Sequence, residues 1–477
     1  MQKVTHSEYI AQKKPLAKQL LAKLNEKYQY ASVLITDNYE KGYRASRSGV
    51  AISATNAFGG KGMIVKVYDG KGYAEYSTNE ITAENLPEIE REIEQQLMNP
   101  ANFIPEGTEE AEYKCISDEP CTLCEATDYE IHPREVGDEK LIETVTALRE
   151  KAVKADERIL DAITGFNYQE YHKLFLSANR ELEQSVLYST GIMALVAAKG
   201  EEIKQSFRGF SNLGGAELLD KMESAIPQCV KTVTDLLNAE PMEPGTYECI
   251  CTPEVTGMIV HEAFGHGVEM DMFVKDRALA QSYVGKQVAS ELVTMHDGAC
   301  AGDQTGSYFF DDEGTLAHDT IIIDHGILKT GISDIRSAEI LSTPPTGNGR
   351  RESFERKAYT RMTNTFFEGG NDKVENMIAS IKYGFLLEEP TSGMEDPKNW
   401  GIQCMVSIAR EIMDGKLTGK IFSPIVLTGY VPDLLKSITM MSGDVKLAGG
   451  GFCGKGYKEW VKVSDGGPYI KAKIRLG

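Results

Sequence analysis

The sequence predicts an α+β fold, in which a mixed α/β N-terminal domain precedes a mostly antiparallel β C-terminal domain. In the first half, apolar residues recur at helical spacing in some segments and form strand-like runs in others. After the Pro/Gly-rich stretch AEPMEPG at 239–245, many short β-like runs are separated by glycine turns. A chain of 477 residues is too long for one ordinary core, so we place the domains at 1–238 and 239–477.

The elements of the N-terminal domain follow from these patterns. A first helix is expected to begin at Pro15, because Leu16, Leu20 and Leu24 share one helical face. Further helices are expected from Pro87 to about 97, over about 138–157 and over roughly 214–238. Strands are expected at 30–38, 62–69, 73–78, 173–178 and 185–198. Residues 100–137 are acidic and irregular in pattern, and we expect an insertion there.

Charge and composition narrow the class of protein. The net charge of −20, from 51 basic and 71 acidic residues, repels phosphate backbones, so no nucleic-acid partner is expected. The first 24 residues carry lysines throughout, and no segment approaches twenty uninterrupted apolar residues. We therefore expect no signal peptide, no membrane partner and a cytoplasmic location. The nine cysteines are an odd number, and reduced thiols are expected.

The most specific motif lies in VHEAFGHG at 260–267, where His261 is followed by Glu262 and His266. Neutral imidazoles are common zinc ligands, and a carboxylate beside one can serve as general base. The familiar motif of this kind spaces its histidines four apart. At a spacing of five, a regular helix would set them roughly 140° apart, against about 40° at four. A π-type turn, or a helix that ends at Gly265, would bring them together, so we predict a local irregularity at 263–267.

A catalytic zinc needs a third protein donor besides two histidines. Glu269 lies one helical turn beyond His266, and Asp271 is a second nearby carboxylate, although either could instead orient a histidine. Cys453, in LAGGGFCGKG at 447–456, is distant in sequence. Its thiolate would bind zinc strongly, and the glycines around it permit a close backbone approach. Sequence spacing leaves all three candidates open.

Several blocks of the second half together resemble the TldD/PmbA family: HEAFGHGVEMD, GSYFFDDEGT, GNGRRESF, RMTN, SGMEDPKNWGIQ and CGKG. The segment GGKGMIVKVYDGKGYAEYS at 59–77 resembles its N-terminal region. The resemblance implies a zinc metallopeptidase that acts on unstructured peptides. It implies His261, His266 and Cys453 as Zn²⁺ ligands and Glu262 as general base. It also implies a homodimer or a heterodimer with a related subunit, and the complete donor set favours the catalytic kind of subunit.

The expected reaction is peptide hydrolysis by metal-activated water, with Glu262 moving the proton to the leaving amine. An unfolded peptide is expected to lie as an extended strand against a sheet edge. Arg361, Thr363 and Asn364 in RMTN are candidates for contacting its backbone, or they only stabilise a turn. Two other functions stay open, namely a non-enzymatic zinc-containing regulatory subunit and a zinc amidohydrolase for a small amide.

Overall fold

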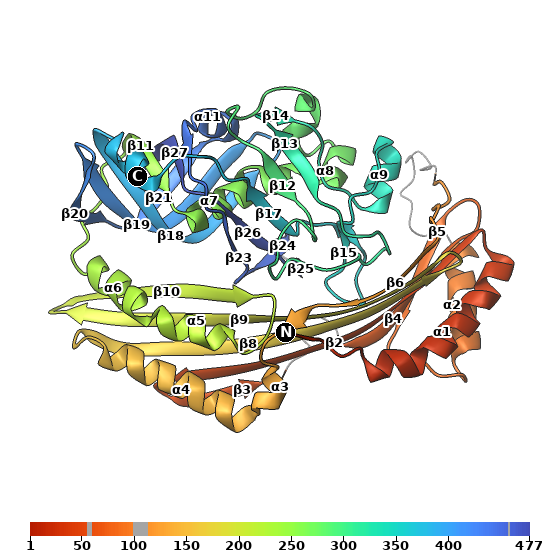
Figure 1. Cartoon of the computed structure of the whole chain (residues 1–477). Coiled ribbons are helices and arrows are strands. Elements are labelled where there is room, and N and C mark those ends of the chain that lie inside the picture. Colours follow the sequence, from red (N-terminus) through yellow and green to blue (C-terminus); the bar gives the residue numbers. More distant parts are fainter. Residues whose placement is uncertain (55–59, 99–112, 457) are drawn as a thin grey trace.

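The structure, a computed structural model, describes residues 1–54, 60–98, 113–456 and 458–477. It has two layers (Figure 1). A long, curved sheet is built from residues that precede position 240, and a β-rich unit built from the later residues lies over one face of that sheet.

The N-terminal sheet has eight strands, in the order β10-β9-β8-β2-β4-β5, with β3 paired to β2 and β6 paired to β9. All neighbours are antiparallel except β6, which runs parallel to β9. The strands are β2 (Tyr30–Ser46), β3 (Gly49–Ser53), β4 (Lys61–Tyr68), β5 (Tyr73–Thr78), β6 (Cys121–Ala126), β8 (Ile159–Ser177), β9 (Arg180–Lys199) and β10 (Glu202–Asn212). Two short strands, β1 (Gln2–Lys3) and β7 (Asp128–Tyr129), pair separately.

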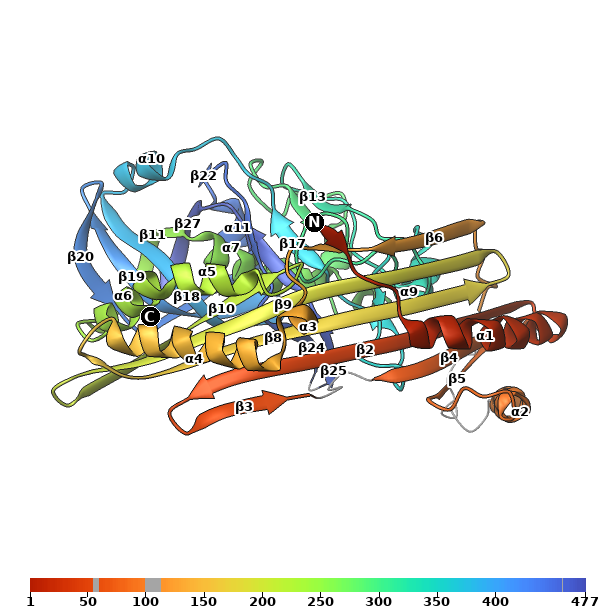
Figure 2. The ribbon, with the colours of Figure 1, turned by 60° about the horizontal axis from the view of Figure 1, so that its bottom comes forward.

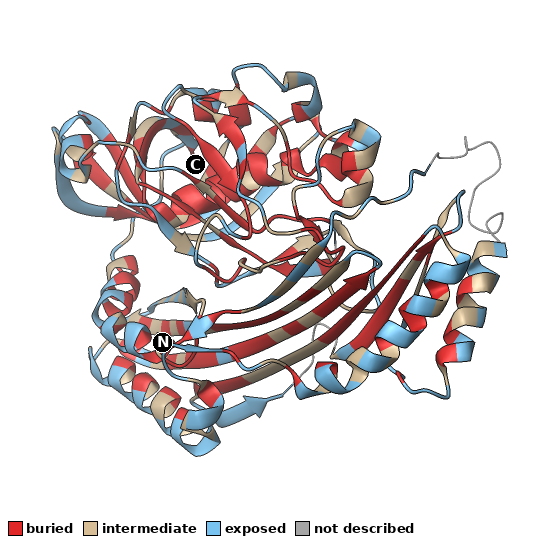
Figure 3. Ribbon diagram, turned by 45° about the vertical axis from the view of Figure 1, so that its right-hand side comes forward, coloured by how far each residue is buried: buried red, intermediate tan, exposed pale blue. Residues whose placement is uncertain are grey.

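Helices cover the face of this sheet that comes forward in Figure 2. They are α1 (Glu8–Lys27), α2 (Leu86–Met98), α3 (Pro133–Val136), α4 (Asp138–Lys154), α5 (Leu218–Ser224) and α6 (Ile226–Leu236). Successive side chains of a strand point to opposite faces, so Leu174 and Leu176 of β8 pack with the helices while Phe175 packs against Phe310 of the other layer. The centre of the sheet is therefore buried on both faces (Figure 3).

Two helix boundaries differ from the sequence-based expectation. Helix α1 begins at Glu8, not at Pro15, because the Ser7 side chain accepts a hydrogen bond from the backbone N–H of Ile10 at 3.1 Å and caps the helix. The helix expected at 214–238 is divided into α5 and α6. Pro227 lies in the first turn of α6, where a proline costs no helical hydrogen bond.

The segment expected as an irregular insertion at 100–137 is partly regular. Residues 99–112 lie outside the described residues. Cys121–Ala126, however, forms β6 and extends the sheet beside β9, so the expectation of irregular chain is wrong there. Cys115, Cys121 and Cys124 are free thiols.

The C-terminal unit is built on two sheets. In the larger one, β11, β18, β19, β21 and β27 form a closed ring, because β11 pairs with both β18 and β27. Its strands are β11 (Gly245–Cys251), β18 (Tyr383–Asp396), β19 (Gly401–Met413), β20 (Lys416–Phe422), β21 (Ile425–Tyr430), β22 (Met440–Met441) and β27 (Ile470–Leu476). All but one of the neighbouring pairs are antiparallel.

The smaller sheet has the order β14-β13-β12-β17-β26-β23. Its strands are β12 (Met295–Asp297), β13 (Thr320–Asp324), β14 (Ile327–Leu328), β17 (Asn364–Phe367), β23 (Lys446–Ala448) and β26 (Ser464–Gly467). Two hairpins stand apart, one of β15 (Gly349–Arg350) with β16 (Tyr359–Thr360) and one of β24 (Phe452–Lys455) with β25 (Lys458–Lys462).

Helix α7 (Pro253–Val260) lies between the two C-terminal sheets and packs against β18 on one side and β26 on the other. The remaining helices are short: α8 (Met270–Val274), η4 (Leu279–Tyr283), α9 (Ile335–Leu341), α10 (Val374–Ala379) and α11 (Val431–Lys436). The predicted α+β class with a β-rich C-terminal region is confirmed. The boundary that we propose at 239–245 falls between α6 and β11. Within the described residues, no helix is both long and apolar enough to cross a membrane.

Candidate metal centre

The histidine motif lies where α7 changes its helical period. After Val260 the chain forms a π-helical turn, η2 (His261–Gly265), followed by a 3₁₀ turn, η3 (His266–Val268). This is the irregularity that the five-residue spacing predicts, because i→i+5 closure returns His266 to the side of His261. The two imidazole centroids lie 5.1 Å apart with their planes nearly perpendicular.

Gly265 is required for this turn to pack. A Cβ at this position would lie 2.2 Å from the Sδ atom of Met362, well inside van der Waals contact. Because Met362 is fully buried, it has little room to move away. The glycine therefore lets the helical turn approach the neighbouring segment closely.

Of the three candidates for a third donor, Cys453 is the one that meets the histidines. It lies on β24, and its Sγ atom is 3.3 Å from Nε2 of His266. Donor atoms of His261, His266 and Cys453 all lie within 4.8 Å of one another, and within the described part of the chain they form the one group of this kind. Asp271 instead pairs with Lys455 and Lys275.

The donor set fits a metal ion of the zinc type. Burial alone would raise the pKa of the Cys453 thiol, but the adjacent His266 and His261 hold that pKa well below its usual value. The favoured form is therefore the thiolate, which is the form that binds metals. The Nδ1 atom of His261 is buried without a hydrogen-bond partner among the described residues. Two imidazoles and one thiolate are donors that zinc accepts in catalytic sites.

Glu269 contacts His266 at Nδ1, the ring nitrogen opposite the one that faces Cys453, and so orients the ring. Its Oε2 atom lies 3.4 Å from Nδ1 of His266 and 3.1 Å from Nζ of Lys455, and its Oε1 atom lies 3.4 Å from Nε of Arg361. Burial raises the pKa of this carboxyl, but Lys455 and His266 lower it more, so it stays ionised. A carboxylate of this kind fixes the orientation of a ligating imidazole. Asp465 lies near His261, but the 4.0 Å between its Oδ2 and Nδ1 is too long for a hydrogen bond.

Glu262 lies in the π-turn beside strand β18. A Cβ on Gly393 of that strand would lie 2.3 Å from Cγ of Glu262, so the strand can pass this close only with glycine there. On the same strand, Glu395 accepts a hydrogen bond from the backbone N–H of Gly267 at 3.0 Å. Burial raises the pKa of Glu395 well above its usual value. Sequence reasoning missed Glu395, whose only signal is its place beside Asp396 in SGMED.

Arg361, Thr363 and Asn364 are fully buried, which favours the structural alternative over peptide contact. Arg361 donates hydrogen bonds to the backbone carbonyls of Cys453 (2.8 Å) and Glu459. Thr363 donates to Asp297 at 2.7 Å, and Asn364 donates to the carbonyl of Gly298 at 3.0 Å. Arg361 therefore fixes the strand that carries Cys453, and Thr363 and Asn364 fix the backbone near Asp297.

Comparisons with known proteins find relatives among metallopeptidases. Residues 244–475 match the model of the PmbA/TldA metallopeptidase C-terminal domain. A metalloprotease TldD homolog of Buchnera aphidicola subsp. Schizaphis graminum is 30% identical over 341 residues, which are 68% of this chain and 70% of that one. A zinc metalloprotease TldD homolog of Saccharolobus solfataricus is 28% identical over 312 residues, 64% of this chain and 69% of that one.

The fold also matches solved structures. The crystal structure of TldE from Thermococcus kodakarensis aligns with a TM-score of 0.74 at 17% identity, over 97% of this chain and all of that chain. At this identity the likeness concerns the fold alone. The sequence matches show that this chain belongs to the TldD/PmbA family of metallopeptidases.

Proposed function

We propose that the chain is a zinc-dependent peptidase that hydrolyses unstructured peptides, with His261, His266 and Cys453 as metal ligands and Glu262 as general base. The observation that supports this most is the meeting of donors from distant parts of the chain at one π-turn. Glu262, directly after the first ligand, is the carboxylate that a hydrolytic site requires and that a purely structural zinc site does not.

A bound zinc ion would polarise the scissile carbonyl and lower the pKa of a water molecule toward neutrality. Glu262 takes the proton of that water and delivers it to the leaving amine. Glu269 keeps His266 oriented, and Arg361 holds the backbone of Cys453 in place. The Cys453 thiolate adds a negative charge that three neutral histidines would lack, which favours a slow, selective peptidase.

Strand β18 offers an edge for an extended peptide. Strand β11 pairs with only its first part, Gly384–Leu387, and no described strand pairs with that edge beyond Leu387. The unpaired part passes Glu262 at Gly393. Backbone pairing along such an edge requires an unfolded substrate, which supports a peptide over a small amide.

The test combines metal analysis of the purified protein with digestion of an unfolded peptide library. Glu262→Gln keeps the shape of the side chain but removes its basicity, so we expect full zinc content and a fall in cleavage of about 10²–10⁴-fold. Glu291→Gln, at an exposed position, is a matched control that should leave both unchanged. Undiminished cleavage by Glu262→Gln would refute the assignment of the base, and metal-free wild-type protein would refute the zinc site.

We also infer that the chain acts as a dimer, with a second copy or with a related subunit, as its family membership suggests. Light scattering of the purified chain distinguishes the two, because a homodimer has twice the mass of 52.6 kDa. A monomer that gains cleavage activity only with a related chain would identify the heterodimer.

A further inference from the structure

The hairpin that carries Cys453 also carries a lysine on its opposite face. In the hairpin β24–β25, Cys453 is paired with Val461 and Phe452 with Lys462. Neighbouring residues of a strand point to opposite faces, so Lys462 and Phe452 face away from the metal ligands. The Nζ atom of Lys462 lies 4.5 Å from the centroid of the Phe452 ring.

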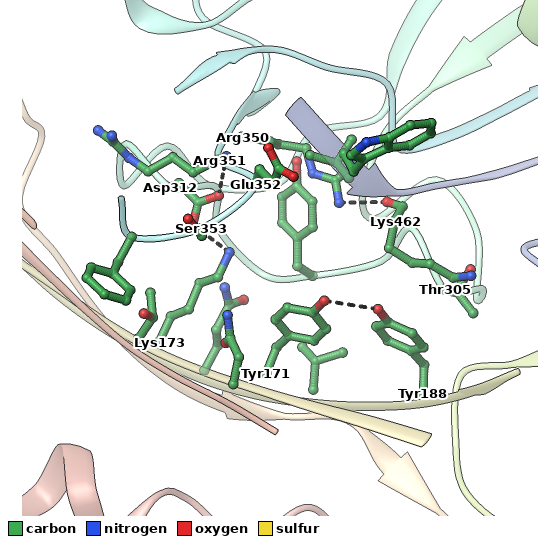
Figure 4. A pocket seen from close by; sticks show the side chains of 18 of the residues that line it. Tyr171, Lys173, Tyr188, Thr305, Asp312, Arg350, Arg351, Glu352, Ser353 and Lys462 are labelled. Carbon is green, nitrogen blue, oxygen red and sulfur yellow. Dashed lines mark hydrogen bonds and ion pairs between the residues drawn. The ribbon is translucent and has the colours of Figure 1, made fainter. Parts of the chain in front are cut away.

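Lys462 faces a cavity of about 60 Å³ between the two layers of the molecule (Figure 4). Tyr171 and Tyr188 rise into it from β8 and β9 of the N-terminal sheet, and Arg350 and Lys462 enter from the C-terminal unit. Ile64, Val186, Phe354, Phe452 and Trp460 form much of the remaining lining. The cavity is therefore amphipathic, since charged, hydroxyl-bearing and apolar side chains all line it.

Four basic and two acidic side chains line this cavity, although the whole chain carries a net charge of −20. Two of the bases have carboxylate partners, because Lys173 pairs with Asp312 at 2.5 Å and Arg351 pairs with Glu75 at 2.7 Å. Arg350 donates to two backbone carbonyls, those of Met362 and Lys462, which leave its charge uncompensated.

The fourth base of the lining is Lys462, and its ammonium group differs from the other three. The residue is 4% exposed, and its Nζ atom has no hydrogen-bond partner among the described residues. A buried, unpaired ammonium costs free energy, and burial lowers the pKa of Lys462 to about 7, with only a partial opposing effect of Glu40. The ring faces of Tyr188 and Phe452 compensate this cost only weakly.

We propose that this cavity is a binding site for a carboxylate, whose oxygens pair with the ammonium of Lys462 while its apolar part packs on the aromatic lining. A carboxylate matches the site because its negative charge compensates the unpaired ammonium of Lys462, and Arg350, whose hydrogen bonds go to backbone carbonyls, adds to the positive charge of the lining. The volume corresponds to about five water-sized probe volumes, which suits a small planar group. Two sources have this chemistry: a free small carboxylate, or the carboxylate of a peptide, and the second rests on the proposed peptidase function.

The test measures the unfolding temperature of the metal-loaded protein against acetate, succinate, inorganic phosphate and a hexapeptide with either a free or an amidated C-terminus. The Glu262→Gln background prevents cleavage, so binding is read without any peptidase activity. We expect carboxylates to stabilise the protein and Lys462→Met to weaken their binding at least about tenfold. Lys473→Met, which removes an exposed charge elsewhere, is the matched control.

The probes also separate the two sources. Stabilisation by acetate or succinate identifies a free carboxylate, and stabilisation by the acid peptide but not its amide identifies a peptide carboxylate. Equal carboxylate binding by the Lys462→Met protein, or binding of phosphate but of no carboxylate, would overturn the proposal. Equal binding of acid and amide peptides together with no binding of acetate or succinate would overturn it as well. If Lys462→Met fails to fold, protection of the Lys462 amine from cyanate by the same probes replaces it, and unchanged labelling counts against the site.

Binding should also depend on pH. The titratable or charged groups around the ammonium are Glu40 from β2, Tyr171 from β8, Tyr188 from β9 and Arg350 from β15. Burial raises the pKa of both tyrosines, so they stay neutral near pH 7. Lys462 is therefore the group that changes charge there, and carboxylate binding should be tighter at pH 6 than at pH 8.

Discussion

The two faces of the hairpin β24–β25 are built on opposite electrostatic principles. On the face of Cys453, charges are balanced within the protein, since Glu269 contacts His266, Lys455 and Arg361 together. On the face of Lys462, a buried ammonium has no partner among the described residues. The difference teaches that burial of charge alone does not mark a ligand site. On the first face the donor atoms are held by charged partners, and on the second the ammonium lacks a counter-charge.

The largest effect is expected from Cys453→Ser, which removes the thiolate from the face of the hairpin whose charges are balanced. A neutral hydroxyl replaces a thiolate, and the two remaining histidines are too few to hold a catalytic zinc. Metal content should fall to near zero together with peptide cleavage, while the fold is retained because the other face is untouched. Elemental analysis and circular dichroism check this. Cys300→Ser, at an exposed thiol, should change neither, and full metal content in Cys453→Ser would contradict the ligand assignment.

A smaller effect is expected from Glu269→Gln, which removes the negative charge that orients His266. Loss of such a carboxylate typically weakens metal affinity by about 10–100-fold. Competition with a metal chelator measures this affinity. Asp271→Asn also removes a carboxylate near Lys455, but Asp271 does not contact a histidine. The metal affinity of this variant should therefore stay within a factor of a few of the wild-type value. Equal losses in both variants would show a general charge effect and not orientation of His266.

The smallest effect is expected from Lys462→Met, and it should be a gain in stability. The pKa of Lys462 is about 7 in the folded protein and near 10.4 in the unfolded chain, so between these values the unfolded chain binds more protons. The destabilisation by Lys462 is therefore complete below pH 7 and fades as pH rises toward 10.4. Chemical unfolding at pH 6 and pH 9 should show a larger gain for Lys462→Met at pH 6. A gain that is independent of pH would mean that packing, not charge, is responsible.

Part of the site could be predicted from the local spacing of residues in the sequence. The five-residue interval between His261 and His266 predicted a local irregularity, because a regular helix would not place both on one side, and the structure realises the π-turn, one of the two forms left open. The choice of Cys453 over Glu269 rested on family resemblance, since no local pattern links residues that far apart. No sequence pattern identifies Lys462, because its lack of a hydrogen-bond partner depends on how the two layers pack together.

The same dependence on contacts formed only in the folded chain explains where the predicted fold differs from the structure. Pro15 was expected to begin α1, but the cap formed by Ser7 decides where that helix starts. Strand β6 has few apolar residues, because it lies at the sheet edge beside β9 and its order comes from pairing across distant sequence. For RMTN, the sequence left peptide contact and a structural role open, and Arg361 supports the structural role, because it is buried and donates to backbone carbonyls that only the folded chain brings to it.

The separation of the donors along the chain also governs when the centre can form during synthesis. His266 and Cys453 are 187 residues apart, so a ribosome must translate all of that sequence after the second histidine before the thiolate exists. Until then, a nascent chain presents two histidines without their third donor. Translation itself thus delays assembly of the donor set until the C-terminal sheets that hold it have also been made.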